Sequence, residues 1–102
     1  MKRKQVTVLW EEGLHARPAA KLVKLALSFQ STIFLNANER VADARSILGV
    51  LLLCASLGTV IDLEVSGEDE ETALATIAWE FESGDFENPI RRDTEPEDSK
   101  KP

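Results

Sequence analysis

The chain has 102 residues and a formal net charge of −6, from 12 lysine and arginine residues against 18 aspartate and glutamate residues. Its length fits a single domain, and its 43% apolar content allows one hydrophobic core. The negative charge argues against a general nucleic-acid-binding role, which needs clustered basic side chains. Because Cys54 is the only cysteine, no intrachain disulfide can form, and we expect a buried, unreactive thiol in a reducing compartment.

Neither a targeting segment nor a membrane segment is predicted. The basic residues 1–4 are not followed by the continuous apolar stretch that a secretory signal needs. The longest apolar run, residues 47–55, contains Gly49 and is too short to span a membrane. We therefore expect a cytoplasmic protein without a membrane role.

The hydropathy pattern of the first half of the chain predicts a strand, a helix and two further strands. Residues 5–10 alternate as a strand does, with one face made of Val6, Val8 and Trp10. Residues 16–29 form a helical stripe made of Ala19, Leu22, Val23 and Ala26. Residues 32–36 and 40–44 read as two further strands, joined by a turn at Asn38, a residue type that tolerates left-handed backbone.

The second half of the chain repeats this alternation of helix and strand. Ser46 is placed to cap a helix over residues 47–55, which Gly58 follows shortly afterwards. Residues 60–66 alternate again as a strand. Residues 70–83 form an amphipathic helix whose acidic first turn suits the positive end of the helix dipole. The order β-α-β-β-α-β-α predicts an α+β fold in which helices cover one face of a mostly antiparallel sheet.

The composition changes sharply after this last helix. Gly84 is a natural helix terminator, and residues 85–102 are charged, contain prolines and have almost no apolar side chains. We therefore predict one folded domain over residues 1–84 and a disordered charged tail over residues 85–102.

The candidate for chemistry is the only histidine, His15, which lies between the first predicted strand and helix in the sequence GLHARPAA. The N–H groups of a first helical turn attract anions, and the helix dipole favours a neutral, nucleophilic imidazole. Arg17 can offer its guanidinium group to a phosphate oxygen. These features favour a phosphorylation site, with a capping histidine beside a solvated arginine as the alternative. The pattern leaves open whether the helix begins at Ala16 or at Pro18.

Residues 13–19 resemble the phosphorylation-site signature of HPr, the histidine-containing phosphocarrier family of the bacterial phosphoenolpyruvate-dependent sugar phosphotransferase system. Residues 45–51, RSILGVL, resemble the regulatory-serine helix of that family, at the usual separation. Residues 67–70, GEDE, are similar to the entry into its last helix. The resemblance covers residues 5–84 and implies an open-faced β-sandwich with a four-stranded antiparallel sheet and three helices.

The resemblance also implies a reaction. His15 would receive a phosphoryl group on Nδ1 from the phosphohistidine of enzyme I and pass it to a histidine of an enzyme IIA-type protein. Arg17 and the backbone N–H groups of Ala16 and Arg17 would hold the phosphate. Such a monomeric carrier forms a phosphohistidine but has no small-molecule turnover of its own, and neither a metal nor an organic cofactor is implied.

A docking surface follows from the helical spacing. Ala20, Lys24 and Leu27 share the face of the first helix opposite its core stripe. Ile47, Leu48 and Leu51 give the second helix more apolar side chains than one core-facing stripe needs. An apolar patch ringed by Arg17, Lys24 and Arg45 would suit acidic partners, whereas the alternative places the three apolar residues in the core.

Ser46 has two interpretations. A serine before a helix is a common N-cap, which explains the residue by itself. In the HPr family a serine here is the target of a bifunctional kinase/phosphorylase, and the phosphorylated form can act as a corepressor with a transcription regulator. Relatives specialised for that role lack the active histidine, which this chain keeps. A nitrogen-related signalling relay is a further alternative to a sugar-transport carrier.

Three residues depart from the family pattern. Glu12 replaces a small polar residue ahead of the site, and its charge would repel a phosphate. Glu39 replaces a common turn glycine, and Asp43 stands where asparagine is frequent.

Overall fold

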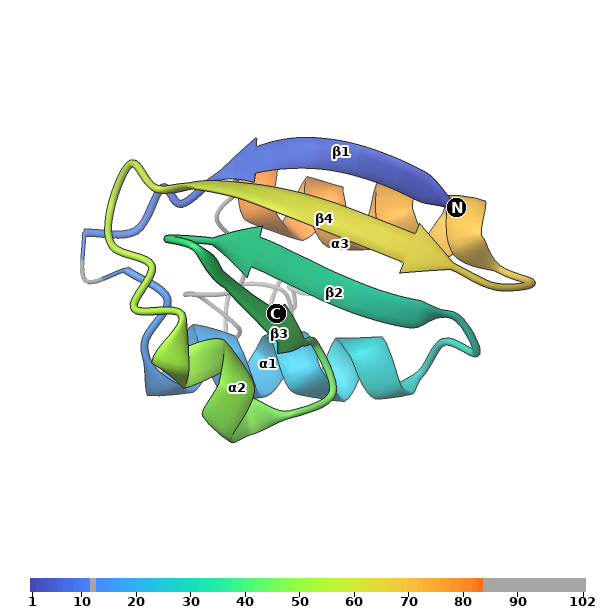
Figure 1. Cartoon of the computed structure of the whole chain (residues 1–102), viewed down its shortest axis with the longest axis horizontal. Helices are drawn as coiled ribbons and strands as arrows, with labels where there is room; N and C mark the ends of the chain where they lie inside the picture. Colours follow the sequence, from blue (N-terminus) through green and yellow to red (C-terminus); the bar gives the residue numbers. More distant parts are fainter. Residues whose placement is uncertain (12, 84–102) are drawn as a thin grey trace, which may run out of the picture.

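A computed structural model of the protein describes residues 1–11 and 13–83 (Figure 1). Glu12, Gly84 and the predicted tail over residues 85–102 lie outside the described residues. The elements follow the predicted order of strands and helices. They are β1 (Lys2–Thr7), α1 (Ala16–Leu27), β2 (Thr32–Ala37), β3 (Arg40–Asp43), α2 (Ile47–Leu52), β4 (Val60–Ser66) and α3 (Glu70–Ser83).

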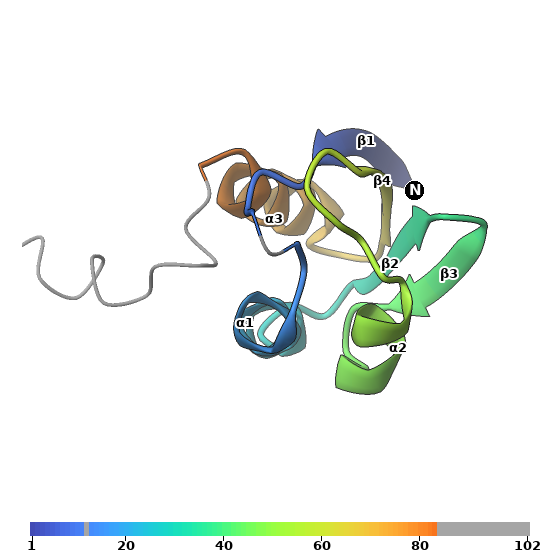
Figure 2. The same ribbon diagram turned by 90° about the vertical axis from the view of Figure 1, so that its left-hand side faces the viewer.

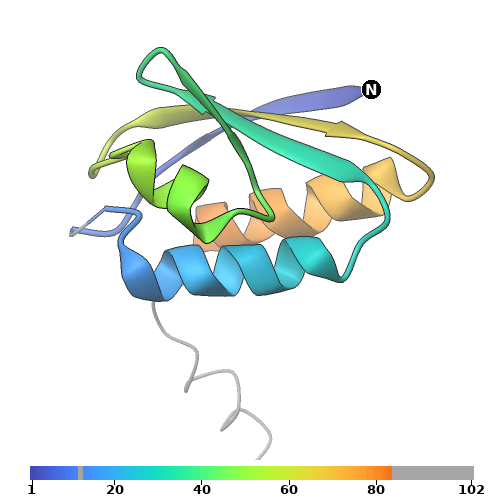
Figure 3. The ribbon, with the colours of Figure 1, turned by 60° about the horizontal axis from the view of Figure 1, so that its bottom comes forward.

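The four strands form one antiparallel sheet in the order β1-β4-β2-β3, and the helices cover one of its faces (Figure 3). On β4 the side chains of Ile61, Leu63 and Val65 are buried, whereas Asp62 on the opposite face is exposed. This alternation is the one predicted for a sheet with one covered face. The fold is therefore an α+β open-faced sandwich. Among the described residues, no helix is long and apolar enough to cross a membrane.

Strand β1 is shifted by three residues from the prediction: it covers Lys2–Thr7, whereas the predicted strand covers residues 5–10. Its basic start pairs with β4 and also forms ion pairs with distant acidic residues, Lys2 with Glu71 at 3.3 Å and Lys4 with Glu82 at 3.5 Å. The ladder with β4 stops at Thr7, yet Val8 and Trp10 remain buried. The predicted inward face therefore continues into the loop after the strand.

Helix α2 is three residues shorter than predicted, and the prediction of a buried Cys54 thiol is wrong. The helix ends at Leu52, Leu53 takes the buried position, and Cys54 is exposed. The backbone of Cys54 is left-handed, with φ of 54°. Because this conformation cannot continue a right-handed helix, it turns the cysteine away from the core.

Two loops meet at the far end of α1, where the carboxylate of Asp69 accepts hydrogen bonds from the N–H groups of Gln30 and Ser31 and from the Ser31 hydroxyl. The hydroxyl bond and the Gln30 N–H bond hold the pKa of Asp69 below its ordinary value. Gly67 passes so close that an added Cβ would lie 2.6 Å from the Cα of Ser31. This junction fixes the C-terminal end of α1 against the start of α3.

Candidate phosphorylation site

His15 is the N-cap residue of α1, with extended backbone at φ −92° and ψ −164°. The helical ladder opens with the N–H of Ala19 donating to the carbonyl of His15 at 2.9 Å. The N–H groups of Ala16 and Arg17 lie in the first turn ahead of that bond, where helices bind anions. The helix begins at Ala16, so Pro18 is its third residue, which settles the alternative that the sequence left open.

The loop that carries His15 is anchored at both ends. The N–H of Leu14 donates to the carbonyl of Ala55 at 2.8 Å, and the Leu14 side chain is buried. Upstream, the buried ring of Trp10 packs against that of Phe81, with centroids 5.5 Å apart. The loop therefore rests on the segment after α2 and on helix α3. Figure 2 shows this loop, the start of α1 and the end of α2 gathered at one end of the molecule.

Gly13 is required by this arrangement for two reasons. Its φ is +76°, a conformation that side-chain-bearing residues rarely adopt. An added Cβ would lie 2.5 Å from the carbonyl oxygen of Ala55 and 2.9 Å from the Cα of Ser56. The glycine thus allows the histidine loop to approach the backbone of residues 55–56.

The imidazole of His15 is only partly exposed. Its Nε2 atom is buried, while the residue as a whole keeps some accessible surface. Arg17 is exposed, two residues further along the first turn, and forms no ion pair with any described residue. A histidine at a helix N-terminus with an available guanidinium group beside it matches the chemistry that a bound phosphoryl group needs.

Ser46 is the N-cap of α2, and its Oγ accepts a hydrogen bond from the N–H of Gly49 at 3.1 Å. The predicted capping role is therefore confirmed, and the serine is exposed. Just before it, Arg45 forms an ion pair with Asp43 at 3.5 Å. Asp43, one of the departures from the family pattern, thus steadies the chain that leads into the helix.

Helices α1 and α2 expose the apolar residues that were predicted for docking. Leu27 is 62% exposed, Ile47 41%, Leu48 65% and Leu51 36%, so none of them belongs to the core. Ala20 and Lys24 are exposed on the same helix as Leu27. The sequence reasoning missed Leu52, which is 52% exposed. We call the following set the α1/α2 surface: Arg17, Ala20, Lys24, Leu27, Ile47, Leu48, Leu51 and Leu52.

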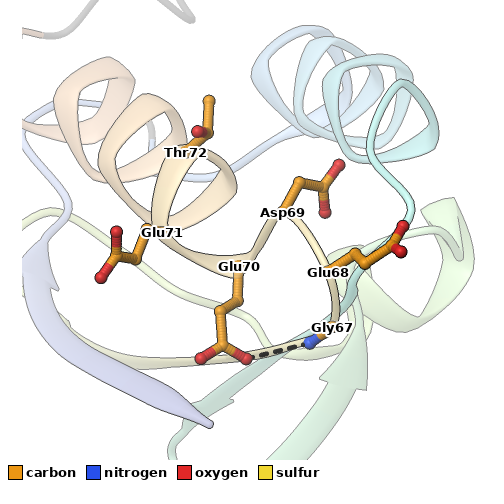
Figure 4. A pocket seen from close by; sticks show the side chains of 6 residues that line it. All are labelled: Gly67, Glu68, Asp69, Glu70, Glu71 and Thr72. Atoms are coloured by element: carbon orange, nitrogen blue, oxygen red, sulfur yellow. Dashed lines mark hydrogen bonds between the residues drawn. The ribbon is translucent and has the colours of Figure 1, made fainter.

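A second group of charged residues, at the start of α3, lies at the opposite end of α1 from His15. Figure 4 shows the carboxylate of Glu70 turned back to the N–H of Gly67, at a distance of 3.0 Å. This backbone hydrogen bond lowers the pKa of Glu70. The Glu70 side chain thus folds back onto the segment that enters the helix, as the second residue of a capping box does. No group of three or more metal-ligating side chains occurs within residues 1–11 and 13–83.

Comparison with known proteins identifies the family. A family profile described as the PTS HPr component phosphorylation site matches residues 2–83. The chain belongs to the HPr family of phosphocarrier proteins. It is 47% identical to the HPr of Xylella fastidiosa over 79 residues, which cover 78% of this chain and 89% of that relative. It is 48% identical to the phosphocarrier protein NPr of Proteus mirabilis over 73 residues, which cover 71% of this chain and 81% of that relative.

The fold of the HPr family is confirmed by solved structures. The crystal structure of HPr-C-His from Thermoanaerobacter tengcongensis superimposes with a TM-score of 0.78 at 37% identity. The match covers 81% of this chain and 93% of that chain. The protein is therefore a phosphocarrier of the phosphotransferase-system type.

Proposed function

We propose that His15 accepts a phosphoryl group on Nδ1 from phospho-enzyme I and passes it to a histidine of an enzyme IIA-type protein in the cytoplasm. In each step a bond from phosphorus to the new imidazole nitrogen forms as the bond to the old one breaks. The single observation that carries this proposal is the partly exposed His15 at the N-terminus of α1. The burial of Nε2 disfavours attack through that nitrogen, which supports the assignment of the phosphoryl group to Nδ1.

Charge stabilisation would come from groups at the start of α1. The N–H groups of Ala16 and Arg17 stand at the positive end of the helix dipole, and the Arg17 guanidinium carries a full charge. Phosphoryl transfer depends mainly on such positioning and electrostatics. The α1/α2 surface would dock both partners, because an apolar patch bordered by Arg17 and Lys24 is complementary to an apolar site with an acidic rim.

The test is incubation of the full chain with phosphoenolpyruvate and enzyme I. We expect an acid-labile, alkali-stable mass gain that disappears in His15→Ala. Arg17→Ala should slow the transfer by about tenfold or more, as the loss of a stabilising charge commonly does. A mass gain that persists in His15→Ala, or a normal rate in Arg17→Ala, would refute the assignment of that residue.

Regulation at Ser46 is the second candidate function. Its hydroxyl is exposed at the edge of the α1/α2 surface, so a phosphate there would add negative charge where acidic partners are expected to dock. Incubation with ATP and a bifunctional serine kinase, with Ser46→Ala as control, tests this role. Slower acceptance of the phosphoryl group from enzyme I after serine phosphorylation is expected. An unchanged rate would refute control of the transfer by Ser46, and a lack of phosphate on Ser46 would also refute a corepressor function that depends on the same modification.

We propose that the working form is a monomer, because the residues assigned to the reaction, His15 and Arg17, are neighbours in one chain at the start of α1. A structure of HPr from Thermoanaerobacter tengcongensis is described as a dimer. Light scattering coupled to gel filtration is expected to give the monomer mass for this chain, and a dimer mass would refute the monomer.

A further inference from the structure

Side chains of Asn38 and Arg40, at the turn between β2 and β3, form hydrogen bonds with the end of α2. The Asn38 side-chain amide donates to the carbonyl of Leu53 at 2.9 Å and to that of Cys54 at 3.3 Å. The Arg40 guanidinium donates to the carbonyl of Leu52 at 3.1 Å. The last carbonyl groups of a helix lack donors within the helix, so these bonds cap its C-terminal end.

Cys54, whose carbonyl accepts one of these hydrogen bonds, has a strained backbone conformation. Cys54 has a φ of 54°, which side-chain-bearing residues adopt only when their surroundings enforce it. The next residue, Ala55, offers the carbonyl that accepts the hydrogen bond from Leu14, immediately before His15. The direction of the Ala55 carbonyl therefore depends on the turn at Cys54.

We propose that Asn38 is a positioning residue for His15. Its amide holds the left-handed turn at Cys54, the turn aims the Ala55 carbonyl at Leu14, and this bond sets the place of the imidazole. This role needs no contact of Asn38 with the phosphoryl group or the partner, and the inference rests on the proposed function of His15. Arg40 caps the same end of α2 through its hydrogen bond to the carbonyl of Leu52.

Asn38→Gly is the sharpest variant, because Asn38 itself has a φ of 52° and glycine keeps that conformation while removing the amide. We expect kcat for phosphoryl transfer from enzyme I to fall by about fivefold or more, with a smaller change in KM, because misplacing a reacting group slows the chemical step. The His15 imidazole NMR signals should shift. Glu39→Gly is the matched control, since Glu39 is exposed and left-handed in the same turn. It should leave both readouts as they are in the unchanged chain.

A rescue separates positioning from a general loss of stability. Adding Cys54→Gly to Asn38→Gly removes the conformational penalty that the amide opposes, so the transfer rate and the His15 signals should return toward those of the unchanged chain. The proposal is overturned if Asn38→Gly transfers at the normal rate. It is also overturned if Cys54→Gly restores neither readout, or if the rate falls only in proportion to the unfolded fraction measured by circular dichroism.

The NMR arm also distinguishes this inference from the function on which it rests. If the unchanged chain accepts no phosphoryl group, the proposed function fails, and the His15 signals of Asn38→Gly still decide the positioning role. Shifted signals that Cys54→Gly restores would support it, and unshifted signals would overturn it.

Discussion

Replacing Gly13 by alanine perturbs the phosphorylation loop at the point where it approaches the neighbouring segment most closely. The left-handed φ of +76° costs about 1–2 kcal/mol for a residue with a Cβ. The new Cβ would also lie 2.5 Å from the carbonyl oxygen of Ala55, so backbone must move, at a cost of about 1–3 kcal/mol. We expect Gly13→Ala to lower the free energy of unfolding by about 2–5 kcal/mol, the sum of these two costs.

Gly58 provides a control that separates the two costs. Its φ is +88°, but an added Cβ would meet nothing within 4 Å. Gly58→Ala should therefore lose only the conformational part, about 1–2 kcal/mol. Urea unfolding of both variants measures the difference, and transfer from enzyme I should slow more in Gly13→Ala. Equal losses of stability in the two variants would refute the close contact between Gly13 and Ala55.

Two further variants test the fold and the docking surface. The pKa of Asp69 is lowered in the folded state, so its contribution to stability is complete above its ordinary value of 3.8 and is lost as the pH falls through the lowered value. Urea unfolding across acidic pH should show a steeper decline in the unchanged chain than in Asp69→Asn, and equal declines would contradict this. Leu48 is 65% exposed, so Leu48→Glu should change the unfolding free energy by less than about 0.5 kcal/mol. The KM for transfer from enzyme I should rise, and an unchanged KM would remove Leu48 from the α1/α2 surface.

Elements with a clear local pattern could be predicted with their ends. Strand β4 alternates buried and charged side chains, and α3 combines an apolar stripe with an acidic first turn, so both match the predicted bounds. The start of β1 gives no such signal, because residues 2–4 are basic. They belong to the strand because their backbone pairs with β4, about sixty residues away along the chain, and the side chain of Arg3 also bonds to that of Glu64. Hydropathy does not detect pairing of this kind.

The candidate site also has a part that the sequence predicts and a part that it does not. His15, Arg17 and Ser46 could be found from the sequence because each belongs to a short motif at the start of a helix. The contacts that hold the loop could not, because they join segments that are distant in sequence, such as Leu14 with Ala55. The sequence does not indicate the left-handed backbone of Cys54, because a cysteine in an apolar run resembles a core residue. The sequence therefore indicates the reacting residues, and the structure adds the contacts that hold them in place.

The central claim is that the imidazole of His15 is phosphorylated on Nδ1. Heteronuclear NMR of the His15 ring, recorded after incubation with phosphoenolpyruvate and enzyme I, tests this most directly. The burial of Nε2 predicts that phosphorus is bonded to Nδ1. A phosphoryl group on Nε2, or on any residue other than His15, would contradict the account.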